Sequence, residues 1–362
     1  MKVFHCGHCQ QLVFFENVSC VKCGHTLAYL ADVSDMASLE LTEDGAWQSP
    51  AGKVYRLCKN YSKEKICNWA IPSETAETLC DSCRLTCVIP DLGVSGNREK
   101  WYRVEVAKRR LIYSLRRLSL LPSGMNADPT MSLRFEFLSD SPGPDGAKVF
   151  TGHSKGRITI NVAEADDAER EKRRLAMHEP YRTLLGHFRH EIGHYYWDRL
   201  IDGSELIEPF RRLFGDERQD YAEALTRHYE QGPPADWQNH YVSAYAGTHP
   251  WEDWAETWAH YLHITDALET AAASGLWLRP ERSDEPVLRP SASLREGRTA
   301  SFDRLIENWF PLTYVVNNLN RGLGLPDGYP FVLSLPTVAK LRFVHDTIAA
   351  VNNSGQGPAG RP

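Results

Sequence analysis

Cysteine is missing from most of the chain: all nine cysteines of the 362 residues lie between Cys6 and Cys87. The residues after Cys87 can therefore form neither disulfides nor thiolate metal sites. A short cysteine-rich segment buries too little apolar surface to fold unaided, so we expect bound metal to stabilise it. This asymmetry predicts two domains, at residues 1–92 and 93–351, followed by a disordered tail at residues 352–362.

Long hydrophobic runs and an excess of positive charge are also missing. No window approaches the roughly 18 consecutive apolar residues of a transmembrane helix, and the opening MKVFHCGHCQQ lacks the apolar core of a signal peptide. The formal net charge of −6 gives no general attraction to nucleic acid. We therefore expect a cytoplasmic protein without membrane contacts, whose reduced cysteines bind metal rather than form disulfides.

The first four cysteines form two Cys-x-x-Cys pairs. Their spacing is typical of a zinc ribbon, in which two tight turns close a tetrahedral site. Gly7 and Gly24 suit these turns because glycine tolerates positive φ. Four thiolates leave no open position, so we predict a structural zinc site formed by Cys6, Cys9, Cys20 and Cys23. Three flanking histidines could replace a thiolate, although four cysteines suffice: His5, His8 and His25.

A second set of cysteines follows, of which only one pair has Cys-x-x-Cys spacing. We predict a second structural zinc site formed by Cys58, Cys67, Cys80 and Cys83. The alternative is a buried pair with two unligated thiols. Cys87 is left over, and we expect it to be a small core residue.

Hydrophobic periodicity predicts a second domain that is mainly helical with a small sheet. Alternating apolar residues predict strands at 133–138 and 157–162, and the second is a candidate edge strand for an extended peptide. Pro180 suits the first turn of a helix that continues to about Ile201. Further helices are predicted near residues 98–120, 216–231, 250–273, 301–321 and 336–351, with a loop at 279–299.

Eight lysines and arginines lie between Arg98 and Arg117. Such a run either binds nucleic acid or forms the solvated face of a helix. The acidic character of the whole chain favours the solvated face.

His190-Glu-Ile-Gly-His194 is an H-E-x-x-H motif. On a helix, residues four apart share a face, so both imidazoles can bind one metal ion. Glu191 lies beside the first ligand and can act as general base on a metal-bound water. A metzincin would require glycine and histidine where this chain has Trp197 and Leu200, so the third ligand must come from elsewhere.

The segment Tyr245-Ala-Gly-Thr-His-Pro-Trp-Glu-Asp-Trp-Ala-Glu supplies the candidate third ligand. Pro250 would begin a helix, on which Glu252 and Glu256 lie one turn apart on the same face. Glu252 would bind zinc, and Glu256 would accept the free ring N–H of a ligating histidine. The alternative ligands are Asp220 and Glu223. His187 lies three residues before His190, but its use as a ligand would disrupt the pairing of His190 with His194.

This combination resembles the zinc site of anthrax lethal factor and the Pro-Pro endopeptidases. The resemblance implies that Glu252 binds zinc, that the Tyr245 hydroxyl stabilises the oxyanion, and that Glu256 supports a ligand. More of the chain, roughly residues 1–270, resembles bacterial zinc-binding metallopeptidases with an N-terminal zinc ribbon. The matching segments are the ribbon, Cys67-Asn-Trp, Cys80–Leu92, Thr151–Asn161, Glu179–His194 and Trp251–His260.

We therefore expect an α+β protein, with a small β-rich zinc-ribbon module followed by a zincin-like, mainly helical domain that contains a small sheet. The expected activity is zinc-dependent hydrolysis of a protein or peptide substrate, with one catalytic and one or two structural zinc ions. The alternative is a zinc-ribbon adaptor or nucleic-acid-associated protein whose zincin domain regulates rather than cleaves. A base at Glu191 favours the enzyme, because a metal site without catalysis does not need one.

Overall fold

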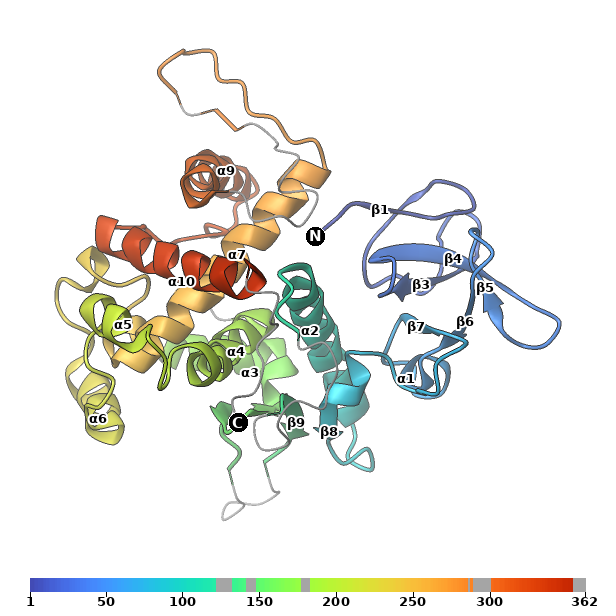
Figure 1. The fold of residues 1–362 in the computed structure, drawn as a ribbon, viewed down its shortest axis with the longest axis horizontal. Coiled ribbons are helices and arrows are strands. Elements are labelled where there is room, and N and C mark those ends of the chain that lie inside the picture. Colours follow the sequence, from blue (N-terminus) through green and yellow to red (C-terminus); the bar gives the residue numbers. More distant parts are fainter. Residues whose placement is uncertain (122–131, 141–147, 177–182, 286, 289–300, 354–362) are drawn as a thin grey trace.

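The computed structural model describes residues 1–121, 132–140, 148–176, 183–285, 287–288 and 301–353. A β-rich N-terminal region and a larger helical region lie on either side of helix α2 (Asn97–Arg117) (Figure 1). The predicted α+β class is confirmed. The described helices include none that is both long and apolar enough to cross a membrane.

The N-terminal region contains a short hairpin and a closed five-stranded barrel. The hairpin pairs β1 (Phe4–His5) with β2 (Leu12–Val13). The barrel closes because β3 pairs with β4 on one side and, in parallel, with β7 on the other. Its strands are β3 (Thr26–Leu30), β4 (Asp35–Leu41), β5 (Trp47–Gln48), β6 (Val54–Leu57) and β7 (Trp69–Pro72), and the one-turn helix α1 spans Lys59–Ser62.

Aromatic side chains fill the space between the hairpin, the barrel and α2. The Phe15 ring lies edge-on to Tyr29, Trp69 and Tyr113, with ring centroids 5.0, 6.4 and 5.6 Å away. Such edge-to-face pairs add to the free energy gained by burying the rings. Since Tyr113 belongs to α2, one apolar core continues from the barrel into the helical region.

A four-stranded sheet in the order β10-β11-β9-β8 lies beside the helices. Its strands are β8 (Thr86–Val88), β9 (Arg134–Leu138), β10 (Gly152–Ser154) and β11 (Arg157–Asn161). The two predicted strands are confirmed as β9 and β11. The prediction that the second is an edge strand is wrong, because β11 pairs with β10 on one side and β9 on the other. The edge position belongs to β10.

The helices of the second region agree with most of the periodicity-based predictions. They are α3 (Asp167–Ala176), α4 (Leu184–Leu200), α5 (Ile207–Phe214), α6 (Tyr221–Gln231), α7 (Pro250–Ala273), α9 (Phe302–Gly322) and α10 (Leu335–Asn353). Helix α5 was not predicted. Pro180, the residues after 353 and most of the predicted 279–299 loop lie outside the described residues.

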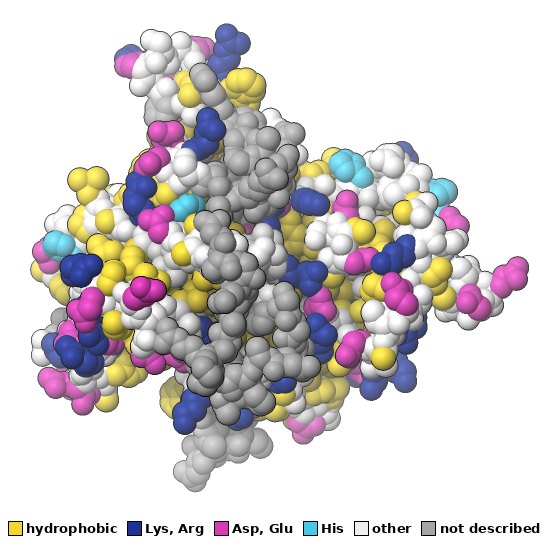
Figure 2. Space-filling view, in the orientation of Figure 1, with side chains coloured by type: hydrophobic (Ala, Val, Ile, Leu, Met, Phe, Trp, Pro, Cys, Tyr) yellow, Lys and Arg dark blue, Asp and Glu magenta, His cyan; other side chains and the backbone are white. Residues whose placement is uncertain are grey.

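The basic run on α2 does not form a solvated face, and that prediction is wrong. Lys108 is fully buried and pairs with Glu105, which is also fully buried, at 2.9 Å. Arg109 is buried and donates to the carbonyl of Ile66 at 2.6 Å. Of the eight basic residues only Arg98 and Arg103 are exposed, and the others are at least partly buried because α2 passes between the two regions. On the face drawn in Figure 2, Lys and Arg side chains lie among Asp and Glu side chains.

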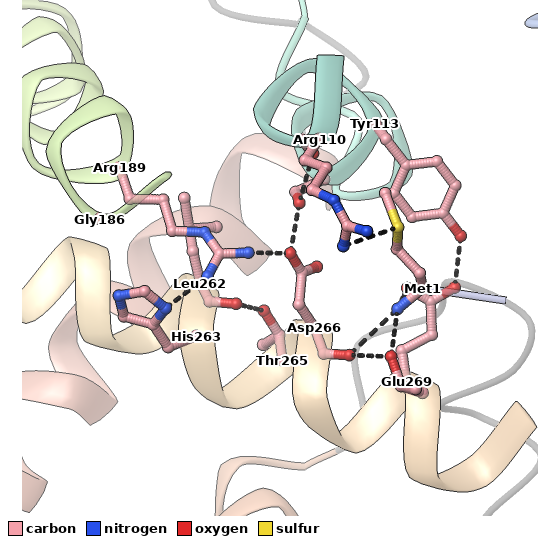
Figure 3. A network of polar contacts seen from close by, with 12 residues as sticks. Met1, Arg110, Tyr113, Gly186, Arg189, Leu262, His263, Thr265, Asp266 and Glu269 are labelled. Carbon is pink, nitrogen blue, oxygen red and sulfur yellow. Dashed lines mark hydrogen bonds and ion pairs between the residues drawn. The ribbon is translucent and has the colours of Figure 1, made fainter. Parts of the chain in front are cut away.

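A polar network lies where α2, α4 and α7 meet (Figure 3). Asp266 of α7 accepts a hydrogen bond from Ser114 of α2 at 2.6 Å and pairs with Arg189 of α4. Glu269, one turn later, accepts from Tyr113 at 2.7 Å. Because Arg189 immediately precedes the H-E-x-x-H motif, this network fixes the orientation of the motif's helix against α7.

Candidate active site

The two helices that carry the predicted site, α4 and α7, cross at very close range. A Cβ atom added at Gly193 would lie 2.9 Å from the Cα of Ala255 and 3.2 Å from its carbonyl oxygen. The indole Nε1 of Trp254 donates to the Gly193 carbonyl at 2.9 Å. Glycine within the H-E-x-x-H motif therefore lets the backbones approach closely, which brings side chains from both helices to one point.

Both helices begin with well-defined caps. The Thr183 hydroxyl accepts a hydrogen bond from the amide of Gly186 at 3.0 Å, and α4 begins at the next residue, Leu184. In α7, the His249 imidazole accepts from the amide of Trp251 at 3.1 Å, and Pro250 occupies the first turn. These contacts satisfy amides that the first turn of a helix leaves unpaired, and proline is favoured there.

Three of the predicted ligands converge where the helices cross. The Nε2 atoms of His190 and His194 lie 3.1 Å apart, and they lie 3.0 and 3.5 Å from Oε2 of Glu252. Zinc bonds of about 2.0–2.2 Å in tetrahedral geometry separate the donors by about 3.4 Å. Apart from the imidazoles, Glu252 Oε2 is buried without a hydrogen-bond partner in the described part of the chain. Two nitrogens and one carboxylate oxygen therefore fit a zinc ion and leave one position open.

Glu256 and Ser243 hold the first histidine. Glu256 Oε1 lies 2.7 Å from Nδ1 of His190, and the Ser243 hydroxyl donates to the other carboxylate oxygen at 2.6 Å. Burial opposes ionisation of Glu256, but its contact with His190 outweighs that effect and lowers the pKa to about 2. A carboxylate at Nδ1 fixes the ring tautomer that directs the Nε2 lone pair toward a metal.

Electrostatics favour an ionised Glu252. Burial opposes its charge, but the neighbouring His194 and His190 imidazoles hold its pKa well below the usual range. The Tyr221 hydroxyl of α6 donates to Glu252 Oε1 at 2.7 Å, which leaves Oε2 directed at the histidines. Tyr221 was not predicted, because its role depends on contact between segments 31 residues apart.

Glu191 and Tyr245 lie next to these donors. The Glu191 side chain is buried, and burial raises its pKa above the usual value. Tyr245 lies in a short 3-10 turn (Tyr245–Gly247) before α7, with its ring centroid 5.9 Å from that of His190. Burial likewise raises the pKa of Tyr245, so its hydroxyl stays protonated and can donate a hydrogen bond.

The alternative third ligands lie elsewhere. Asp220 caps α6, where its side chain accepts from the amide of Glu223 at 2.9 Å, and both residues are exposed. His187 points to Glu164, with Nδ1 3.5 Å from Oε2. Among the described residues, neither Asp220, Glu223 nor His187 joins a group with metal-binding separations.

Two further side chains pack against the second histidine and were not predicted. The Trp251 ring lies 3.7 Å from the His194 ring, measured between centroids. His153 of β10 lies nearly parallel to His194 at 6.4 Å, and its Nε2 accepts from the amide of Gly156 at 3.0 Å. Burial lowers the pKa of His153 to about 4, so it is neutral at physiological pH. The sequence gives no periodic signal for either contact.

The first four cysteines come together at the turn of the β1–β2 hairpin. The sulfur of Cys6 lies 3.6 Å from that of Cys23, and Cys9 lies 3.6 Å from Cys20. Gly24 has φ +76° as expected, but Gly7 does not have positive φ. Gly7 is needed for a different reason, since a Cβ there would lie 2.9 Å from Cγ of Pro50.

The second four cysteines also form one buried group: Cys58, Cys67, Cys80 and Cys83. Backbone amides donate to their sulfurs, from Trp69 to Cys67 and from Cys80 to Cys58, both at 3.4 Å. Such bonds stabilise thiolates that bind a metal. The prediction that Cys87 is a core residue is wrong, because Cys87 is exposed on the edge strand β8.

Comparison with known proteins assigns the family. Residues 97–347 match the family described as "Putative zinc-binding metallo-peptidase", and residues 3–94 match a zinc-ribbon domain. Uncharacterized proteins of Mycobacterium bovis and Mycobacterium tuberculosis are 44% identical over 352 residues, which is 97% of this chain and 96% of each relative. No solved structure matches the chain. The chain belongs to this family of zinc-binding metallopeptidases, with a zinc ribbon at its N-terminus.

Proposed function

We propose that the protein is a gluzincin-like peptidase, in which His190, His194 and Glu252 bind the catalytic zinc and Glu191 is the general base. The convergence of three ionisable donors at the crossing of α4 and α7, directly beside a buried carboxylate, supports this proposal most strongly. Zinc bound there would polarise the scissile carbonyl and lower the pKa of a water molecule.

The protein's own groups supply the remaining chemistry. Glu191 accepts a proton from the attacking water and then donates it to the leaving amine. Burial raises its pKa, which makes it a stronger base than an exposed glutamate. The Tyr245 hydroxyl donates a hydrogen bond to the oxygen of the carbonyl as negative charge develops on it.

An extended substrate would bind along β10 (Gly152–Ser154). This strand is at the edge of the described sheet and packs against α4. No described strand pairs with its outer edge, so a peptide can add one more strand there, which is a common mode of peptide recognition. His153 of this strand lies next to His194, so a peptide on the β10 edge would pass close to the zinc ligands.

We further propose that the two four-cysteine groups bind structural zinc. All four sulfurs of each group lie within metal-binding separations, and four thiolates leave no position for a substrate or water. Their role would be to stabilise the hairpin and barrel, because the free energy of metal binding contributes to folding.

Profiling of new protein N-termini tests the function. A protein extract is incubated with wild type, with Glu252→Gln and with Glu223→Gln, and the zinc content of each protein is measured in parallel. We expect wild type and Glu223→Gln to generate the same new N-termini, because Glu223 is exposed on α6. Glu252→Gln should lose one zinc and all cleavage. Cleavage that persists without this zinc, or wild type that produces no new N-termini, would contradict the proposal and favour the non-proteolytic alternative.

A further inference from the structure

A further group of side chains that could hold a metal ion lies on the surface of the zinc ribbon. His8 belongs to the turn between Cys6 and Cys9, and His25 follows the turn closed by Cys20 and Cys23. The four-cysteine group holds the two turns side by side, so the imidazoles stack with centroids 3.8 Å apart and planes inclined by 21°. The histidines are not needed by the four-cysteine group, which is complete without them.

A carboxylate completes this surface group. Glu40 of β4 directs Oε1 to within 3.6 Å of His25 Nε2. One donor atom each from His8, His25 and Glu40 lies within 4.8 Å of the others. The other ring nitrogen of His25, Nδ1, is buried and has no hydrogen-bond partner among the described residues. Nε2 is therefore the His25 nitrogen that faces Glu40 and can offer its lone pair to a cation, with the proton of the neutral ring on Nδ1.

The group borders a cavity of about 360 Å³ between the hairpin and the barrel. His8 and Glu40 line it, together with the polar side chains of Ser38, Gln48 and Ser49. A water molecule occupies about 30 Å³ in the liquid, so the cavity holds several. Solvent or a small polar ligand can therefore complete the coordination of a cation held by the three side chains.

Charge also favours a cation at this place. A zinc ion with four thiolates carries a net charge of about −2, and Glu40 adds a further negative charge. Two imidazoles and one carboxylate are the donors preferred by zinc and its neighbours in the first transition row, not by magnesium or calcium. Because His8 and Glu40 are exposed, the cation would exchange with solvent more readily than the buried sites.

We propose that His8, His25 and Glu40 bind an additional, exchangeable zinc ion at the rim of this cavity. The site is separate from the active site and does not depend on the peptidase function. The three side chains come from the two turns of the ribbon and from strand β4 of the barrel. A zinc ion bound by all three would therefore stabilise the packing of the hairpin against the barrel.

Calorimetric titration of zinc into the full-length, untagged protein tests this inference. The protein is first saturated with zinc and passed through a desalting column, which removes loosely bound metal and keeps the tightly bound ions. Wild type should then take up one more zinc per chain. The double variant His8→Ala/His25→Ala should take up none, and Glu40→Gln should bind it at least about 10-fold more weakly, since even outer-shell changes cost 10–100-fold.

His5→Ala is the matched control, because His5 is an exposed histidine of the same hairpin outside the group. It should bind the additional zinc as wild type does. The inference fails if wild type takes up no further zinc, or if the double variant still binds it with wild-type affinity. If the double variant also loses tightly bound zinc, its four-cysteine site is damaged and it cannot serve as the test. The test is then Glu40→Gln: if this variant binds the additional zinc with wild-type affinity, the site is rejected.

Discussion

Replacing Gly193 with alanine should disturb the active site without touching a ligand. The added methyl group would lie 2.9 Å from the Ala255 Cα and 3.2 Å from Cβ of Trp258. These are backbone and near-backbone atoms, which cannot rotate away. Helices α4 and α7 must therefore separate by about 0.5 Å to reach an ordinary contact, whereas metal–ligand distances tolerate only about 0.2 Å.

The expected change in the free energy of unfolding is the sum of two opposing effects. Alanine gains about 1 kcal/mol of helix propensity over glycine, and overpacking a core costs about 1–3 kcal/mol. We therefore expect a net loss of about 1 kcal/mol in the free energy of unfolding, together with a clear loss of zinc affinity because His194 and Glu252 lie on opposite helices.

Urea unfolding and zinc competition with a chelator measure both quantities. Gly322→Ala is the matched control, because it is also a helical glycine and a Cβ there meets no atom within 4 Å. It should be neutral or stabilising and should keep all zinc. Our account of the helix crossing would be refuted if Gly193→Ala matched Gly322→Ala in both stability and zinc affinity.

Three further changes should have distinct effects. Tyr245→Phe should keep zinc but lower kcat by about 10²–10³, the usual cost of losing one oxyanion donor; an unchanged kcat would reject that role. Cys67→Ser should lose one zinc and destabilise the barrel, with the zinc bound between α4 and α7 retained, as metal analysis and thermal unfolding would show. Lys340→Met removes the partner of Asp253, a fully buried carboxylate 2.6 Å away, and should cost about 3–5 kcal/mol in urea unfolding; a loss below 1 kcal/mol would contradict this.

The parts of the site that the sequence predicts are those with local signals. His190 and His194 share a helix face by their spacing alone, and Pro250 marks the first turn of α7. Alternating apolar residues likewise identified β9 and β11. These patterns arise from the geometry of one element, so they can be recognised without knowing what packs against it.

The remaining features depend on contacts between distant segments. Strand β10, and not the predicted β11, lies at the edge of the described sheet. Strand order is set by pairing across the sheet, which the periodicity of one segment does not encode. Most basic residues of α2 are at least partly buried because the helix lies between two regions, where Lys108 and Arg117 pair with Glu105 and Glu269. The contacts of Ser243 with Glu256 and of Tyr221 with Glu252 likewise became apparent only in three dimensions.

The turnover number of Glu191→Gln at full zinc occupancy tests the central claim most directly. Glutamine preserves the size of the side chain and does not alter the three proposed ligands, so zinc content and folding should equal those of wild type. We expect kcat on a cleaved peptide to fall by at least about 10²-fold, since a positioned general base contributes that much or more. A fully zinc-loaded Glu191→Gln protein that hydrolyses the peptide at the wild-type rate would contradict the proposed mechanism.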